Sequence, residues 1–454
     1  MEPDKRAQFE TLVAAAVAQH KAGRLPEAER AYCAALQVLP GHAAVTHNLG
    51  VLAANRGDYT LAIKRFDMAL QADPRCSSAH YNRAIALEAL GHRNEAIKGF
   101  ARAALFEPDH YASHRALGFL LLAEGNRGRA LDHFARTYEL RRGEDRTDIA
   151  ASSLTSATRA KLLHDAEQFR YLARRRRDGQ RFELLARNYE AVGISFSPTI
   201  SKLSDANLEI LGEDYNTAIH LIDAPDIAAG AVRKRSNRDE ITSGFGTGGG
   251  GAVYFDDFLT PQALAALKQY LLESTIWHDF GHIGGFVASY LEDGLACPLV
   301  LQIADEARAA FPELLGQYAL TQAWAFKGLE ASSAIDVHAD DAALSLNFWV
   351  TRSQANRNPG RGGLVVYRTP PPVDWTIADY DGDKGRIVSF LEKNGDDRLL
   401  VPYWENRAVL FESRLFHSTD IAEFRQGYED HRINITLLYG NGRAAGADGW
   451  RRQK

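Results

Sequence analysis

The chain has 454 residues, of which 45% are hydrophobic and 24% are charged. This composition is typical of a globular protein with about two to four domains, and it excludes a disordered or fibrous chain. The formal net charge of −5 and the pI near 6.3 exclude a global attraction to nucleic acid or to an anionic membrane, so neither is expected as a partner.

The N-terminal residues MEPDKRAQFE are charged where a signal peptide would need an apolar core. No stretch of about 18 uninterrupted apolar residues follows that could span a bilayer. The three cysteines, Cys33, Cys76 and Cys297, lack C-x-x-C spacing, so neither a disulfide framework nor a zinc knuckle is indicated. We therefore expect a soluble protein of the reducing cytoplasm.

The first third of the chain repeats itself with a period of 34 residues and without gaps. In such a repeat, glycine opens a turn between two helices, alanine lets the helices approach, an aromatic residue fills the seam, and proline ends the unit. The pattern predicts about four helix hairpins up to residue 142. The recurring columns are Gly23, Gly57, Gly91 and Gly125; Ala28, Ala62, Ala96 and Ala130; Tyr32, Phe66, Phe100 and Phe134; and Pro40, Pro74 and Pro108.

This stretch resembles tetratricopeptide repeats, with Gly50, Ala84 and Gly118 at the small position of the first helix of a repeat. The resemblance implies an α-solenoid with a groove that binds an extended or helical peptide. The alternative is that the repeats only dimerise the protein or support its C-terminal part, and the oligomeric state stays open. His110 and His114 are interpreted as solvated helix-face residues rather than metal ligands.

Residues 143–251 are predicted to form a helical cap and bridge that ends in a glycine-rich linker. The run Arg174–Arg177 is interpreted as a solvated face, with a clamp for phosphate or an acidic peptide as the alternative. The segment 244–251, GFGTGGGG, contains G-x-G-x-x-G, but no strand precedes it and no helix follows it. A flexible linker is therefore favoured over a dinucleotide site.

From residue 252 onward the pattern changes to short strands with a few helices. A strand is expected at 252–258, and helices are expected at 260–274 and 298–311. Several short β-rich runs separated by turn residues then predict an antiparallel sandwich or jelly roll, and the whole chain is a multidomain α + β protein. The expected later strands are 320–326, 343–350, 362–367, 399–403, 407–411 and 433–439.

The segment 336–350, DVHADDAALSLNFWV, places His338 and Asp340 directly before an alternating apolar run. On a strand, residues i and i+2 face the same side, so both side chains could bind one ion. His417, just past a late apolar run, offers a third ligand. Two imidazoles and one carboxylate are the ligand set of non-haem iron(II) oxygenases, whereas the alternative for His338 is an ordinary histidine at a strand edge.

A late strand supplies a polar face that needs an explanation. Arg432, Asn434 and Thr436 alternate with the apolar residues of the run 433–439, and a polar inward face is costly unless it meets a ligand. Arg432 could pair with a carboxylate, and Asn347 could bind the same ligand or belong to the core. The motif HDFGH at 278–282 is interpreted as a loop rather than a zinc site.

Residues 252–440 resemble the 2-oxoglutarate- and Fe(II)-dependent oxygenases of the prolyl-hydroxylase-like kind, through His338-Ala339-Asp340, the distal His417 and Arg432. The resemblance implies a double-stranded β-helix (jelly roll) with flanking helices. It implies that His338, Asp340 and His417 bind Fe(II), that 2-oxoglutarate and O2 are co-substrates, and that Arg432 pairs with the far carboxylate of 2-oxoglutarate. The spacing from His417 to Arg432 is longer than in many members, and Arg425 is the substitute for Arg432.

These patterns predict three domains, at 1–142, 143–251 and 252–454. The favoured function is a dioxygenase that hydroxylates a peptide or protein side chain captured by the repeat groove, with Asn347, Asn434 and Thr436 beside the co-substrate. One alternative is a hydroxylase of a small metabolite whose repeats serve oligomerisation. Another is a repeat adaptor with an inactive barrel.

Overall fold

The computed structural model describes residues 3–144, 146–147, 152–246, 250–281, 285–329, 335–372, 375, 384–395 and 397–441. The chain divides into two compact units, and the division falls between Leu121 and Leu122. The first unit is entirely helical where it is described, and the second contains all the described strands. None of the described helices is long and apolar enough to cross a membrane.

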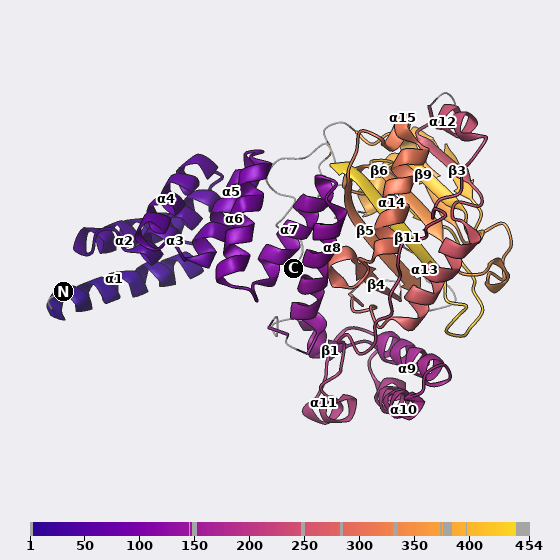
Figure 1. The fold of residues 1–454 in the computed structure, drawn as a ribbon, viewed down its shortest axis with the longest axis horizontal. Helices are drawn as coiled ribbons and strands as arrows, with labels where there is room; N and C mark the ends of the chain where they lie inside the picture. Colours follow the sequence, from indigo (N-terminus) through magenta and orange to yellow (C-terminus); the bar gives the residue numbers. More distant parts are fainter. Residues whose placement is uncertain are drawn as a thin grey trace. The chain divides into compact units, whose positions relative to one another are not determined.

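The N-terminal helices follow one another as hairpins, and Figure 1 traces them in indigo and purple. The four repeated glycines each lie in a turn with a φ between 73 and 80°, a conformation that side chains with a Cβ rarely adopt. This confirms the helical repeats predicted from the 34-residue period. The helices are α1 (Pro3–Lys21), α2 (Leu25–Val38), α3 (Ala43–Asn55), α4 (Tyr59–Ala72), α5 (Ser77–Ala89), α6 (Arg93–Phe106), α7 (Tyr111–Ala123) and α8 (Arg127–Arg142).

The seam between the helices of each hairpin is packed as the repeat columns indicate. Ala62 and Phe66 of α4 are fully buried, and the corresponding residues of α2, Ala28 and Tyr32, are at most 1% exposed. A Cβ added to Gly50 of α3 would lie only 2.6 Å from Cε1 of Phe66. Glycine is therefore required at this position, because the Phe66 ring occupies the space that a side chain would take.

Gly50→Val is expected to destabilise the repeat unit by about 1–3 kcal/mol, because the new side chain collides with the buried Phe66 ring. Calorimetric unfolding of the full chain measures this loss. Ala15→Val, at an exposed position within α1, is the matched control for placing a β-branched residue in a helix. Equal effects of the two substitutions would contradict the packing argument.

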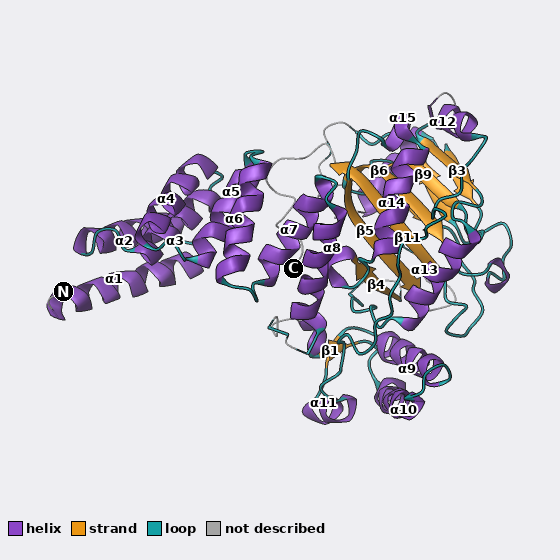
Figure 2. Cartoon of the chain, viewed as in Figure 1, coloured by secondary structure: helices purple, strands orange, loops and turns teal. Residues whose placement is uncertain are grey.

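The second unit is built on two antiparallel sheets, whose strands Figure 2 shows in orange. Hydrophobic side chains from both sheets, among them Trp349 and Phe411 from the larger sheet and Val366 from the smaller one, form a common buried core. The larger sheet has the order β3 (Ala252–Phe255), β9 (Ala408–Glu412), β6 (Ala342–Trp349), β11 (Ile433–Asn441), β5 (Leu320–Gly328) and β4 (Phe286–Tyr290). The smaller sheet has the order β10 (His417–Thr419), β7 (Leu364–Tyr367) and β8 (Arg398–Val401).

The two faces of β11 have different roles. Its apolar residues Ile433, Ile435 and Leu437 alternate with the polar residues and share their face with Tyr439, whose hydroxyl donates to the carbonyl of Ala304 in α14 (Pro298–Ala310) at 3.0 Å. Helix α14 therefore covers the face of the sheet opposite to the polar side chains (Figure 2). The polar face points toward the smaller sheet.

The elements that surround the sheets belong to the same compact unit as the strands. The described helices are α9 (Arg159–Ala173), α10 (Gly179–Ser195), α11 (Asp205–Leu211), α12 (Arg238–Gly246), α13 (Pro261–Glu273), α14, α15 (Pro312–Leu315) and α17 (Lys384–Asn394). A small ladder pairs β1 (Ser156–Ala157) with β2 (Ser201–Lys202), and the short 3-10 helices are η1 (Ser152–Leu154), η2 (Leu291–Asp293) and η3 (Ser353–Ala355).

A buried ion pair joins α8 to η2 within the second unit. The guanidinium of Arg142 donates to Asp293 through Nε at 2.9 Å and through Nη2 at 2.8 Å. Arg142 is 3% exposed and Asp293 is 4% exposed. Burial alone would raise the pKa of Asp293, but the Arg142 and Arg141 guanidiniums outweigh it and hold the pKa of this carboxyl well below its ordinary value.

The segment 244–251 was expected to be a flexible linker, but both of its ends belong to or pair with regular structure. Gly244 and Gly246 belong to α12, and Gly251 accepts a hydrogen bond from the backbone of Glu412 at 2.8 Å beside strand β3. Residues 247–249 lie outside the described residues. The ends are ordered because the backbone of this segment is paired with α12 and with the edge of the larger sheet, which composition alone does not reveal.

Candidate metal centre

His338 and His417 are brought together by backbone pairing. The two residues form an isolated antiparallel bridge, with His338 N–H donating to His417 O at 3.0 Å and His417 N–H donating to His338 O at 2.8 Å. Their ring centroids are 4.3 Å apart. His338 and Asp340 precede β6 rather than lying on it, which corrects the expectation that strand alternation aligns them. The bridge to His417 and the bond from Asp340 N–H to Ser413 O at 2.9 Å hold them instead.

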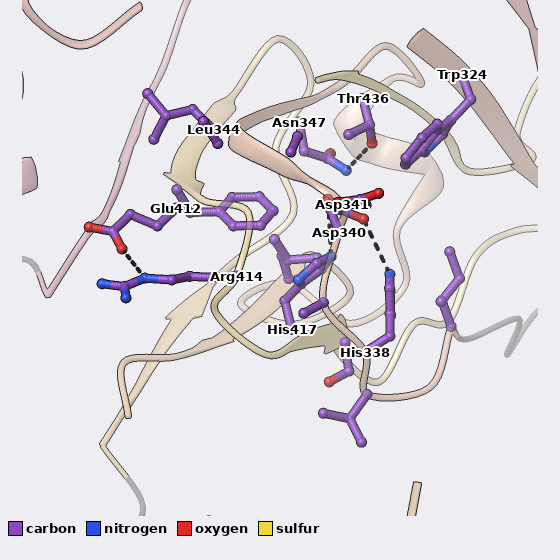
Figure 3. A pocket seen from close by; sticks show the side chains of 18 of the residues that line it. Trp324, His338, Asp340, Asp341, Leu344, Asn347, Glu412, Arg414, His417 and Thr436 are labelled. Atoms are coloured by element: carbon purple, nitrogen blue, oxygen red, sulfur yellow. Dashed lines mark hydrogen bonds and ion pairs between the residues drawn. The ribbon is translucent and has the colours of Figure 1, made fainter. Parts of the chain in front are cut away.

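The side chains of His338, Asp340 and His417 converge, as Figure 3 shows. One potential ligand atom from each lies within 4.8 Å of the other two. His338 Nε2 is 3.8 Å from Asp340 Oδ1, and His417 Nε2 is 3.6 Å from Asp340 Oδ2. These separations suit three ligands of one ion, which would lie between them.

Both imidazoles are oriented by their second ring nitrogen. His338 Nδ1 lies 2.8 Å from the carbonyl of Asp336, and His417 Nδ1 lies 3.0 Å from the carbonyl of Leu415. Since a carbonyl only accepts, each Nδ1 carries the proton, and each Nε2 keeps its lone pair for a ligand. This is the tautomer that metal coordination through Nε2 requires.

The electrostatic environment keeps the more buried histidine neutral. Burial lowers the pKa of His417 to about 4, and the neighbouring His338 acts in the same direction. A neutral imidazole is the form that binds a metal, so no proton has to be displaced from His417 near neutral pH. The ring of Phe411 lies edge-on to His417, with centroids 4.7 Å apart, and restricts its rotation.

Two buried serines hold the carboxylate of Asp340. Ser345 Oγ donates to Asp340 Oδ2 at 2.7 Å, and Ser345 Oγ lies 2.8 Å from Ser413 Oγ. Both serines are fully buried. Neither serine was among the residues predicted from the sequence, although Ser345 is a polar residue on the same face of its strand as Asn347 and Trp349.

Ser345→Ala is expected to weaken metal binding about tenfold or more, because Asp340 loses the hydrogen bond that orients its carboxylate. Titration of the full chain with Mn(II) measures this change. Ser289→Ala removes another buried serine hydroxyl, which bonds the Asp293 carbonyl away from this site, and is the matched control. Equal metal affinity in the two variants would show that Ser345 does not position Asp340.

Arg432 lies in the same pocket as the three converging side chains. Its guanidinium donates to Gly362 O at 3.0 Å, to Asn434 Oδ1 at 3.0 Å and to Gly363 O at 3.3 Å. Burial lowers the pKa of Arg432 to about 10, so it stays charged near neutral pH. These three bonds use three of the five N–H donors, which leaves one on each terminal nitrogen for a ligand. The substitute, Arg425, is exposed and does not line the pocket.

The other three predicted co-substrate residues also line this pocket. Asn347 Nδ2 donates to Thr436 Oγ1 at 3.0 Å, because the two residues are directly opposite each other on β6 and β11. Asn434 supports Arg432 through the hydrogen bond described above. The polar face expected on β11 therefore points into a pocket rather than into apolar core.

The pocket has a volume of about 1230 Å³ and lies between the two sheets. His417 and Leu364 line it from the smaller sheet, and Phe411, Asn347 and Thr436 line it from the larger one. A volume of this size exceeds that of a small dicarboxylate and leaves space for a second molecule beside it.

The remaining sequence candidates do not form a comparable cluster among the described residues. His110 Nδ1 is 2.7 Å from Ser113 Oγ, and His114 Nε2 is 3.1 Å from the Pro108 carbonyl. Both histidines are half-buried and hydrogen-bonded, rather than solvated as expected. His278 is buried in a loop, and its Nε2 lies 2.9 Å from the Tyr138 hydroxyl. His282, the other histidine of the HDFGH motif, lies outside the described residues.

The arginine run lies where α9 ends and beyond it. Arg175 stacks on Tyr171, with 3.6 Å from Cζ to the ring centroid, and Arg176 Nε donates to Asp178 at 2.9 Å. Arg175 and Arg176 therefore contact neighbouring side chains, and Arg174 occupies the C-cap position of α9. The structure shows no anion site built around them within the described residues.

Known proteins resemble this chain in its repeats. The tetratricopeptide repeat family model matches residues 13–75 and 47–111, which shows such repeats in the N-terminal region. No curated protein matches the chain.

Three solved structures illustrate the likeness. MamA from Desulfovibrio magneticus RS-1 is 23% identical, over 30% of this chain and 77% of that one, with a TM-score of 0.28. A mutant O-GlcNAc transferase of Thermobaculum terrenum is 29% identical, over 30% of this chain and 28% of that one, with a TM-score of 0.28. The first repeat domain of Spaghetti (RPAP3), bound to an HSP90 peptide, is 19% identical, over 26% of this chain and 94% of that one, with a TM-score of 0.26.

Proposed function

We propose that the chain is a 2-oxoglutarate- and Fe(II)-dependent oxygenase that hydroxylates a side chain of a peptide or protein. The observation that carries this proposal is the convergence of His338, Asp340 and His417 within 4.8 Å, in a pocket that also contains the buried cation Arg432. Histidine, carboxylate and histidine on one side of an ion are the ligand set of this class of oxygenase.

The donor set fits Fe(II). Two imidazoles oriented through Nδ1 and one carboxylate held by Ser345 supply three ligands, and the adjacent pocket leaves room for a co-substrate. When bound, iron in such a site supplies the chemistry of O2 activation coupled to oxidative decarboxylation of 2-oxoglutarate.

The protein's own groups would bind and orient the co-substrate. The two remaining N–H donors of Arg432 suit the far carboxylate of 2-oxoglutarate, and burial strengthens this charge-assisted pairing. Asn347, Asn434 and Thr436 line the same pocket and offer further polar contacts. The Phe411 ring packs against His417 and shields this candidate ligand from water on one side.

The fold that we assign to the second unit together with this function is a double-stranded β-helix, or jelly roll. Two facing antiparallel sheets with a shared apolar core, and with the candidate ligands at the strand ends between them, support this assignment. The order of strands, in which β9 pairs β6 while β10 pairs β7, requires the chain to cross repeatedly between the sheets. Such crossing is typical of jelly rolls.

The repeats support a protein or peptide as the substrate. Tetratricopeptide repeats present a groove that commonly binds peptides, and a tethered groove raises the local concentration of a captured chain at the active site. The repeats alone are also compatible with an adaptor whose barrel is inactive. The oriented imidazoles and the serine-held carboxylate favour the enzyme, because an adaptor has no need of them.

Succinate formation by the full chain that requires both Fe(II) and 2-oxoglutarate tests the proposal. Mass spectrometry of candidate peptides for the gain of one oxygen then separates a peptide substrate from a metabolite. A chain that binds neither metal nor 2-oxoglutarate would support the adaptor and overturn the enzyme.

Arg432→Gln is expected to raise the 2-oxoglutarate concentration needed for half-maximal binding by roughly 10- to 100-fold, because a charge-assisted hydrogen bond in the pocket is lost. Calorimetric titration with 2-oxoglutarate in the presence of Mn(II) measures this change, and the affinity for Mn(II) itself stays unaltered. Arg425→Gln, at the exposed substitute position, is the matched control. Equal 2-oxoglutarate affinity in both variants would contradict the assigned role of Arg432.

A further inference from the structure

One wall of the pocket changes from aromatic to polar along a single row of the larger sheet. Tyr290 on β4 is opposite Trp324 on β5, Trp324 is opposite Thr436 on β11, and Thr436 is opposite Asn347 on β6. All four residues line the pocket. The Tyr290 and Trp324 rings are half-buried, with centroids 6.5 Å apart and planes inclined by 66°.

Most charged side chains of the pocket are matched by a partner. Asp336 pairs with Lys384, and Glu412 pairs with Arg414 at 2.6 Å. Glu313 lies 3.5 Å from Arg238, and Asp340 belongs to the candidate ligand set. With Arg432 assigned to the co-substrate, these pairings account for all but one of the described charged side chains that line the pocket.

The remaining charge is the carboxylate of Asp341. It is solvent-exposed, lines the pocket, and has no hydrogen-bonding or ion-pairing partner among the residues that the structure describes. Figure 3 shows it next to Asp340, on the side toward Trp324. An unmatched carboxylate in a pocket that is also lined by an aromatic ring is a suitable receptor for a cation.

A second, independent observation is the amide of Asn347. This residue is only 7% exposed, and its Nδ2 is satisfied by Thr436. Its Oδ1 is buried and has no partner within the described part of the chain. A buried acceptor without a donor costs free energy, on the order of 1–3 kcal/mol, so this atom favours a ligand that brings an N–H or O–H group.

We infer that this part of the pocket binds a positively charged side chain of the substrate, an ammonium or a guanidinium, with Asp341 as its counter-charge and Trp324 as its stacking surface. The inference rests on the proposed function, whose substrate class it names. The available groups are acceptors and aromatic faces, and a cationic donor satisfies both kinds. Asp341 directly follows Asp340, so a cation held there brings the aliphatic carbons of the same side chain close to the candidate metal ligands.

The probes are the N-acetyl methylamides of lysine, arginine, norleucine and glutamine, added to the full chain with and without Mn(II) and 2-oxoglutarate. Ligand-observed NMR measures their binding. The lysine or arginine probe is expected to bind about tenfold more tightly than the norleucine or glutamine probe, as the combined effect of one exposed ion pair and one cation–π contact. The preference between the lysine and arginine probes identifies ammonium or guanidinium as the ligand.

Asp341→Asn is expected to abolish the preference for cations while Mn(II) and 2-oxoglutarate still bind. Glu412→Gln removes the same charge from the same pocket, but from a residue already paired with Arg414, and is expected to keep the preference. Equal binding of all four probes, or an unchanged preference in Asp341→Asn, would overturn the inference. Since Mn(II) and 2-oxoglutarate binding are measured in the same samples, a failure of the proposed oxygenase function is recognised separately.

Discussion

Replacing His417 by alanine is expected to abolish metal binding and 2-oxoglutarate turnover by the full chain. His417 supplies a buried, neutral imidazole whose Nε2 lies 3.6 Å from Asp340 Oδ2, and alanine leaves only two of the three ligands. Loss of a hydrogen bond behind a ligand already weakens metal binding about 10- to 100-fold, so loss of the ligand itself is expected to exceed roughly 100-fold. Calorimetric titration with Mn(II) and the rate of succinate release measure the two effects.

The matched control for this substitution is His220→Ala. His220 is a partly buried histidine whose ring contacts Arg176, away from the residues that line the pocket. The control is expected to bind Mn(II) as the unaltered chain does. If His417→Ala retained the metal affinity of the control, the metal centre would be wrongly assigned and the oxygenase proposal would fail with it.

Arg142→Met is expected to destabilise the second unit by about 3–5 kcal/mol, because it leaves the carboxylate of Asp293 buried without its closest counter-charge. Arg141 lies 3.5 Å from the same carboxylate and is more exposed, so it compensates for only part of the loss. Urea unfolding of the full chain, followed by the fluorescence of its buried tryptophans, measures the change in the free energy of unfolding.

The double variant Arg142→Met, Asp293→Leu tests the cause of this loss. It removes both charges, and it is expected to be more stable than Arg142→Met alone, since no buried carboxylate remains uncompensated. If the double variant were as unstable as the single one, the loss would come from packing of the arginine side chain rather than from the charge. Helix α8 would then be held to η2 by shape rather than by electrostatics.

The repeats could be predicted from the sequence because their information is local. Each glycine, alanine and aromatic column recurs every 34 residues, and the contacts of a hairpin join residues within one period, as Gly50 and Phe66 do. The strands β5, β6 and β11 were also predicted, at 320–326, 343–350 and 433–439, because these runs are rich in residues that favour strands and alternate in residue type. The short strands β4 and β10 were not, because runs of five and three residues carry too little alternation to distinguish a strand from a loop.

The candidate site was predicted as residue types but not as a structure. His338, Asp340 and His417 were selected by their order, and a strand was expected to align the first two, whereas a bridge between His338 and His417 holds them. Ser345 and Ser413 were missed because nothing near them in the sequence marks a hydroxyl that belongs to the hydrogen-bond network of a carboxylate 5 or 73 positions away. Asp341 was hidden beside the more conspicuous Asp340.

By itself the amino-acid sequence determined the helical repeats, the polar face of the strand that follows Arg432, and the residue types available as ligands, because each of these depends on neighbours in the chain. Only the tertiary structure decided which of fifteen histidines meet, which carboxylates are paired and which hydrogen bonds orient them. The physical reason is that Asp340 and His417 lie far apart in the chain, and pairing between distant segments, not local conformation, brings their side chains together.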